Sequence, residues 1–253
     1  MKTKILLVPA LALCSLAFIS CDKDDSNNNQ ADARIRTYIE DNSSSPFGSI
    51  DTFDVTFDAS NRASVISDRS GDFSMNYTYN GTSSYIMTMV ESGSPTLWEK
   101  FMSNGMGLID STIQSETPGD SLTEKYFYNA SSQVIEMRSY NYGSGVSMLD
   151  EITRYQYDGN GNKTKEILLD AAEDTMYVMT TAYNNTVPTW YNSGIQFMPV
   201  LQKNLPVSIT TYYPSSGDAE VTQITYEMDN SNRITKETYT SLFGTYTKRY
   251  IYF

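Results

Sequence analysis

The sequence predicts an all-β protein: a large curved antiparallel sheet or partly closed barrel built from repeated β-hairpins. Alternation is the first observation, because in residues 73–79 Phe, Met and Tyr alternate with Ser, Asn and Thr and so form one apolar and one polar face. The second is a short turn phrase that recurs along the chain. The third is composition: 13% of the 253 residues are aromatic, including 20 tyrosines, which suits a half-buried pleated surface.

Residues 1–20 have the layout of a secretory signal peptide, with a positively charged start and an apolar stretch too short to span a bilayer as a helix. The stretch runs into Phe-Ile-Ser-Cys21, which resembles the lipobox of bacterial lipoproteins. The resemblance implies that Cys21 is lipidated and becomes the new N-terminus, while Cys14 leaves with the signal. An ordinary signal peptide or a short membrane anchor is the alternative.

Residues 21–34 are polar and acidic at first, and we expect them to form a disordered tether. An acidic cluster directly after the lipidated cysteine resembles the export signal of Bacteroides-type lipoproteins. It implies an outer-membrane location, with lipid on Cys21 as the contact with the membrane and the protein facing the exterior. In enteric bacteria Asp22 would instead indicate retention on the inner membrane.

Residues 35–253 are predicted to be one repeat domain. Its unit is an alternating strand that ends in an aromatic residue, then Asp or Asn, two or three turn residues, and a second alternating strand. Asp or Asn followed by Gly tolerates positive φ and closes a hairpin. The copies centre on Asp58, Asn80, Asn129, Asp158 and Asp229, and degenerate copies are expected at residues 102–109 and 183–185.

Residues 154–164 read Arg-Tyr-Gln-Tyr-Asp-Gly-Asn-Gly-Asn-Lys-Thr, which resembles the YD repeat of Rhs-type wall and surface proteins. With the Lys-Asn-Leu-Pro run at 203–206, the arrangement resembles a family of Bacteroides-type lipoproteins of unknown function that is described as having a porin-like β fold. The resemblance covers residues 35–253, implies an architecture, and carries over no catalytic residue.

Three further expectations concern the fold. Because a single hairpin is only marginally stable, the repeats are expected to pair edge to edge. We expect the sheet not to span a membrane, because its outward positions are polar. Residues 33–42 are the one candidate for a short helix.

Composition excludes several chemistries. The chain has no histidine, so it cannot contain a Ser-His-Asp triad or a His-ligated metal, and no cofactor is expected. With 18 basic and 30 acidic residues, it lacks the positive charge that nucleic-acid binding requires. The run Asp-Gly-Asn-Gly-Asn at 158–162 has part of the pattern of a calcium loop but lacks the distal Glu, so we interpret it as a hairpin turn and predict no metal site.

Candidate ligand-stacking aromatics are Trp98, Trp190 and Tyr191, in predicted irregular stretches beside prolines. Cross-strand packing is the alternative role for such aromatic residues. The carboxylates that could form a catalytic pair are scattered through predicted loops and outer faces, and no spacing makes a convincing pair, so no catalytic residue is predicted; they are Glu116, Asp120, Glu124, Asp150, Glu151, Glu173 and Asp174.

These observations predict a non-enzymatic, lipid-anchored protein of the cell envelope that serves as a binding or structural module. A glycan, a peptide or another envelope protein is the expected partner. The alternative is a polysaccharide hydrolase that works through a pair of carboxylates.

Overall fold

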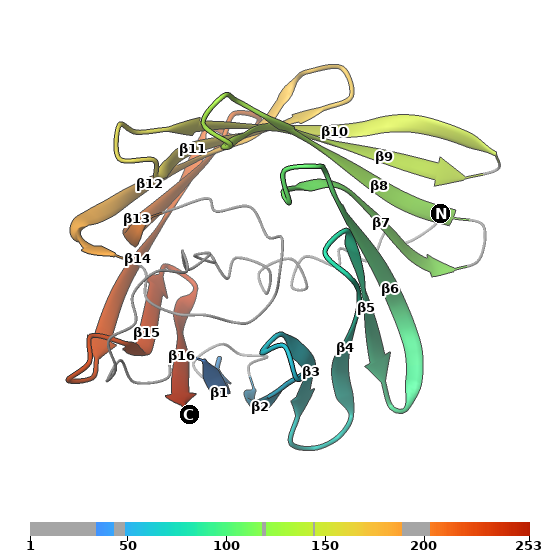
Figure 1. The fold of residues 1–253 in the computed structure, drawn as a ribbon. Coiled ribbons are helices and arrows are strands. Elements are labelled where there is room, and N and C mark those ends of the chain that lie inside the picture. Colours follow the sequence, from blue (N-terminus) through green and yellow to red (C-terminus); the bar gives the residue numbers. More distant parts are fainter. Residues whose placement is uncertain (1–33, 43–48, 118–119, 144, 189–202) are drawn as a thin grey trace.

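The computed structural model describes residues 34–42, 49–117, 120–143, 145–188 and 203–253, in which sixteen strands form one closed antiparallel barrel (Figure 1). Each strand pairs with its neighbour in sequence, and β1 pairs with β16 to close the sheet. The all-β prediction is confirmed, and the curved sheet closes completely. The strands are β1 (Ile35–Asp41), β2 (Ile50–Phe57), β3 (Ala63–Asp68), β4 (Phe73–Asn80), β5 (Ser84–Glu91), β6 (Ser94–Ser103), β7 (Ile109–Thr117), β8 (Asp120–Tyr128), β9 (Val134–Gly143), β10 (Val146–Tyr157), β11 (Lys163–Asp170), β12 (Thr175–Pro188), β13 (Asn204–Tyr213), β14 (Asp218–Met228), β15 (Ile234–Ser241) and β16 (Gly244–Tyr252).

The segment considered for a short helix is a strand, so that expectation is wrong. Residues 35–41 form β1, which pairs with β16 on one side and β2 on the other. An isolated helix of this length is marginal in water, whereas the strand satisfies two open sheet edges at once. Tertiary pairing therefore overrides the weak local preference.

The two faces of the barrel wall differ sharply in burial. Tyr85 on β5 and Phe101 on β6 are buried and stack with their ring centroids 4.3 Å apart. Ile86 and Trp98, which point to the opposite face of the same strands, are 39% and 42% exposed. The buried, tyrosine-rich face is therefore the concave inside of the barrel. A second cluster of the same kind joins Tyr38, Phe53 and their neighbours on β1, β2, β3 and β16.

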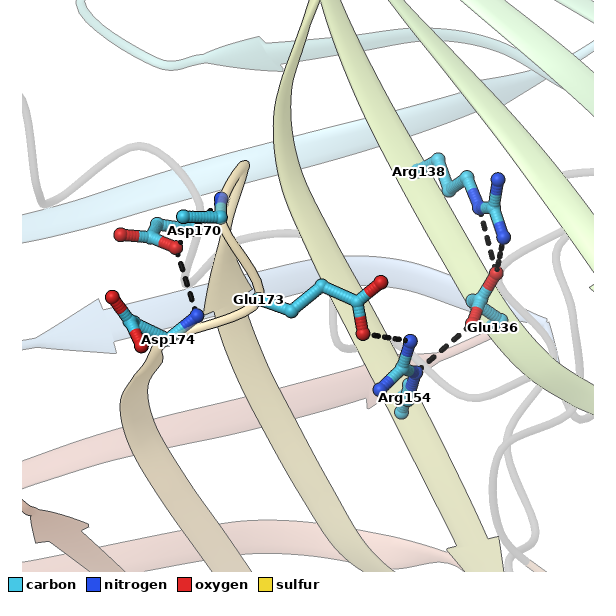
Figure 2. Close-up of polar contacts among 7 residues, drawn as sticks. Glu136, Arg138, Arg154, Asp170, Glu173 and Asp174 are labelled. Carbon is cyan, nitrogen blue, oxygen red and sulfur yellow. Dashed lines mark hydrogen bonds and ion pairs between the residues drawn. The ribbon is translucent and has the colours of Figure 1, made fainter.

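The outer wall carries charged side chains within its strands. Glu227 on β14 pairs with Lys236 on β15 at 2.8 Å, and Glu136 on β9 accepts from both Arg138 and Arg154 (Figure 2). The sequence led us to expect polar outward positions. This expectation holds only in part, because exposed apolar side chains lie among the charged ones. Those on the outer wall include Ile86, Trp98, Phe127, Val221 and Ile251.

One five-residue turn recurs six times. In residues 58–62, the N–H of Asp58 donates to the carbonyl of Arg62 (2.8 Å), and the Asp58 carboxylate accepts from the N–H groups of Ser60 and Arg62 (2.8 and 2.9 Å). The fourth residue, Asn61, has a φ of 59° and donates its N–H to the carbonyl of Asp58. The same bonds close residues 104–108, 129–133, 158–162, 170–174 and 229–233.

Five of these turns lie at the same end of the barrel, which we call the repeat end; the sixth, residues 170–174, lies at the opposite end, the variable end. The start of β1 and the end of β16 also lie at the repeat end, because Arg34 donates to Asn61 in the first turn (2.7 Å) and Phe57 contacts Phe253 (ring centroids 5.8 Å apart). Both ends of the described barrel therefore emerge beside the repeated turns.

The predicted copies are only partly of this kind. Asp58, Asn129, Asp158 and Asp229 occupy equivalent turns, and the degenerate copy around Asn104 makes the full set of bonds. Asn80 instead pairs with Ser84 in a tighter turn. The copy expected at residues 183–185 is wrong, because these residues continue β12, in which Asn184 pairs with Leu205.

Tyrosine hydroxyls connect neighbouring hairpins at the repeat end. Tyr157, directly before one turn, donates to the carbonyl of Val134, directly after the previous turn, at 2.8 Å. Each bond ties the close of one hairpin to the start of the next, so the recurring tyrosine has a structural role. The equivalent pairs are Tyr79 with Ala63, Tyr128 with Ile109, Tyr183 with Lys163, Tyr226 with Pro206, and Tyr252 with Ile234.

Candidate functional site

The sequence-predicted site residues do not form a cluster in the part of the chain that is described. Trp98 lies in the middle of β6, between Thr88 of β5 and Ser115 of β7, on the outer wall. The expectation that it sits in an irregular stretch is wrong, since Pro95 is also part of β6 at a bulge opposite Val90. Cys21, Trp190 and Tyr191, like the signal and the tether up to residue 33, lie outside the described residues.

The inner wall holds carboxylates among tyrosines in three places. In the first, the Tyr126 hydroxyl donates to the Glu124 carboxylate at 2.5 Å, and the Thr112 hydroxyl donates to the same oxygen at 3.3 Å. Burial, reinforced by the negative charge of Glu124, raises the pKa of Glu99 to about 7; Glu99 lies on β6, two strands from Glu124 on β8. Burial also raises the pKa of Tyr126 well above its usual value, and the negative charge of Glu124 adds to the shift.

In the second place an inward-facing lysine takes part. The Lys163 ammonium lies 2.6 Å from the Glu166 carboxylate and 5.3 Å from the centroid of the Tyr155 ring. Tyr177 donates to the other oxygen of Glu166 at 3.0 Å. Lys163 and Glu166 are both largely buried, so their charges compensate each other inside the wall.

The third place lies on β15, β16 and β1. Tyr239 donates to the Glu237 carboxylate at 2.7 Å, and the Lys248 ammonium pairs with Glu40 at 3.0 Å. Burial raises the pKa of Glu237, while Tyr239 and Lys248 oppose the shift. Lys248 also lies 5.6 Å from the centroid of the Tyr246 ring.

The carboxylate prediction is therefore wrong for Glu124 and Glu151, which point inward and not outward. Burial raises the pKa of Glu151, with Asp150 and Glu124 adding to the shift. Glu99, Glu166 and Glu237 were missed altogether. The signal was present in the alternation, because Glu99 is flanked at i−2 and i+2 by Leu97 and Phe101 on the buried face.

The reactive groups of these three places on the inner wall are mainly carboxyl groups and hydroxyl groups. The described residues contain no group of three or more His, Cys, Asp or Glu side chains that could hold a metal ion. A carboxyl with a pKa near 7 beside a second carboxylate is an arrangement that general acid–base catalysis uses. The same groups also satisfy each other structurally, as the hydroxyl donors to Glu124 show.

Comparison with known proteins places the fold. No family model and no curated protein matches the chain. A porin-like protein from Bacteroides uniformis matches the structure with a TM-score of 0.63 at 12% sequence identity, covering 88% of this chain and 98% of that one. A porin-like protein from Bacteroides vulgatus matches with a TM-score of 0.60 at 11% identity, covering 88% and 99%. The chain therefore has the fold of these porin-like β-barrels.

Within the residues that the structure describes, no helix is long and apolar enough to cross a membrane.

Proposed function

We propose that this chain is a non-enzymatic protein of the bacterial outer membrane, held there by lipid on Cys21 and serving as a binding module on the cell exterior. The fold shared with porin-like proteins of Bacteroides supports an envelope location. The lipobox-like run at Cys21 supports the lipid anchor.

The single observation that carries the proposal is the position of the barrel's two ends. Arg34 and Phe253 both lie at the repeat end, so the preceding tether would reach the barrel there. An anchored barrel would then turn its repeat end towards the membrane. Its variable end would face away, where a partner can reach it.

The outer wall supports a barrel that lies outside the bilayer. Membrane-spanning barrels present an apolar band to lipid, and a Lys or Arg at the bilayer midplane costs about 2–4 kcal/mol. Here charged side chains such as Arg138, Arg154 and Lys236 lie on the outside within the strands. The protein is therefore proposed to be tethered to the membrane and not embedded in it.

The test is metabolic labelling with radioactive palmitate in a Bacteroides host, followed by fractionation and surface proteolysis of intact cells. We expect label on the full chain, none on Cys21→Ala, and release of that variant from the membrane fraction. Label on neither protein would refute the anchor. Retention of unlabelled Cys21→Ala in membranes after alkaline extraction would instead indicate an embedded barrel.

A polysaccharide hydrolase is the second candidate, and Glu99 is the observation that favours it, because its pKa of about 7 suits a general acid beside Glu124. Release of new reducing ends from a polysaccharide panel, lost in Glu99→Gln, would establish it. We expect no such release.

A further inference from the structure

A pocket of about 250 Å³ opens at the variable end of the barrel, where β14, β15 and β16 meet the end of β1. Tyr239, Tyr246 and Phe243 supply aromatic walls, and hydroxyl and amide groups stand between them. The mouths of β-barrels are a common place for small-molecule sites. All the residues that line this pocket are uncharged; those with hydroxyl or amide groups besides the tyrosines are Ser241, Thr222, Thr245 and Asn42.

Largely buried carboxylates of the barrel wall lie next to the two tyrosine side chains. Tyr239 donates its hydroxyl to the buried Glu237 at 2.7 Å, and burial and the neighbouring Glu40 raise the pKa of Tyr246. The rings lie 5.6 Å apart between centroids at an angle of 42°. Because Glu237 is itself 3% exposed, the wall fixes the Tyr239 ring before any ligand arrives.

Phe243, at the edge of this pocket, is more exposed than the two tyrosines. It lies in the β15–β16 turn and is 72% exposed, next to Leu242, which is 90% exposed. Leu242 does not line the pocket, whereas Phe243 does. An exposed aromatic ring at the edge of a pocket can contact a ligand there, and aromatic residues are enriched at binding sites.

We propose that this pocket binds one ring of a neutral oligosaccharide; the proposal deepens, and rests on, the function proposed above as a binding module. A pyranose presents C–H groups on its faces and hydroxyls around its rim. The C–H faces would pack on Phe243 and the tyrosine rings, and the sugar hydroxyls would exchange hydrogen bonds with Ser241 and Asn42.

The charge of the pocket selects the class of sugar. A uronic acid or sulfated sugar would bury its anion in walls that offer no cation, close to the carboxylates of Glu237 and Glu40. Lys248, the cation nearest these carboxylates, is already paired with Glu40 and is 8% exposed. A neutral sugar carries no such desolvation cost.

The experiment titrates the full-length chain, purified in detergent, with maltohexaose, cellohexaose, laminarihexaose and mannohexaose, using calorimetry. Hexagalacturonate serves as the anionic probe. We expect at least one neutral hexasaccharide to bind and hexagalacturonate to bind at least tenfold more weakly. No neutral binding at millimolar concentration, or equal binding of hexagalacturonate, would overturn the proposal.

Matched variants of the same turn locate the binding. Phe243→Ala should weaken binding at least tenfold, and Ser241→Ala about threefold, while Leu242→Ala should stay within twofold of the parent. All three are checked by circular dichroism and thermal unfolding. Phe243 and Leu242 are exposed turn residues, so their replacement should leave both measurements unchanged, whereas Ser241 ends β15 and accepts a hydrogen bond from the N–H of Phe243. Equal loss in Phe243→Ala and Leu242→Ala would refute the site. Palmitate labelling is independent of sugar, so failure here would leave the anchor intact.

Discussion

The two ends of the barrel are built on different principles. At the repeat end, five hairpins close with the same turn, and tyrosine hydroxyls join each hairpin to its neighbour. At the variable end, connections range from the two-residue turn at Ser92 and Gly93, both with positive φ, to the longer connection after Asp41. Only one turn there, at residues 170–174, has the bonds of the repeat end.

This difference separates architecture from recognition. Identical turns place successive hairpins in the same relation to one another, which is what a closed wall of sixteen strands requires. Connections that make no contribution to this regularity are free to differ in length and composition. Phe243, Met148 and Tyr212 are exposed side chains at the variable end, while Met106 and Phe253 are exposed at the repeat end.

The largest effect is expected at the repeat end, at Asn162. Its fully buried amide donates to Asp158 and Asn204 (both 3.0 Å) and accepts from the N–H groups of Lys203 and Asn204 (2.9 and 2.8 Å). Asn162→Ala leaves these buried groups without their partner and should lower the free energy of unfolding by about 3–4 kcal/mol.

Denaturant titration followed by circular dichroism measures this loss. Asn160→Ala, in the exposed part of the same turn, is the control and should change stability by less than about 0.5 kcal/mol. A loss in Asn162→Ala no larger than in the control would show that the turn does not hold the repeat end together.

The next prediction concerns the wall between the two ends, where the titration of Glu99 should make stability depend on pH. Its pKa is raised to about 7 by burial and by Glu124, so between about pH 4.5 and 7 the folded state retains a proton that the unfolded state releases. Stability should therefore fall as pH rises through this window, by up to about 3 kcal/mol for this group. Glu99→Gln removes the titration and should flatten the curve.

Unfolding free energies at pH 4.5, 6 and 7.5 check the effect. Glu227→Gln, on the exposed outer wall, should keep the parental slope. Glu237 and Glu151 also have raised pKa values, so a smaller slope of the same sign should remain in Glu99→Gln. A slope as steep as that of the parent would show that Glu99 is not the group that titrates.

The tyrosine bonds give a smaller effect. Tyr157→Phe removes one hydroxyl that donates to the Val134 carbonyl and should cost about 1 kcal/mol. Tyr212→Phe at the variable end changes a side chain that is 43% exposed and should cost less than about 0.5 kcal/mol. The two variants are compared by thermal unfolding, and equal losses would remove the distinction between the ends.

The sequence predicted the parts of the fold that depend on neighbouring residues. The turns at Asp58 and Asp229 need only an acceptor side chain and a residue that tolerates positive φ three positions later, and both are local. Prediction from local sequence resemblance failed where the pairing partner is distant in the sequence. Asn184 has the surroundings of a repeat copy but continues β12, because β13 offers it a ladder partner in Leu205.

Closure and the inward carboxylates lie beyond local patterns. Whether β1 meets β16 depends on every intervening pairing, so the sequence left open a curved sheet and a partly closed barrel. Glu124 reads as a surface residue until the register places it between Thr112 and Ser139 on the buried face. The pocket beside Phe243 joins β14, β15, β16 and Asn42, which no spacing in the sequence brings together.

The smallest effect compares one turn position at both ends. Ser132 at the repeat end and Glu173 at the variable end both have positive φ, 60° and 66°, where glycine is free of strain. Ser132→Gly should stabilise the protein by about 0.5–1 kcal/mol. Glu173→Gly gains the same relief but loses the exposed ion pair with Arg154 (2.8 Å; Figure 2), worth a few tenths of a kcal/mol, so its gain should be smaller. In high salt, which screens that pair, unfolding titrations should show the two gains converging; a difference that persists would mean that the surroundings of the two turns, and not the ion pair, set them apart.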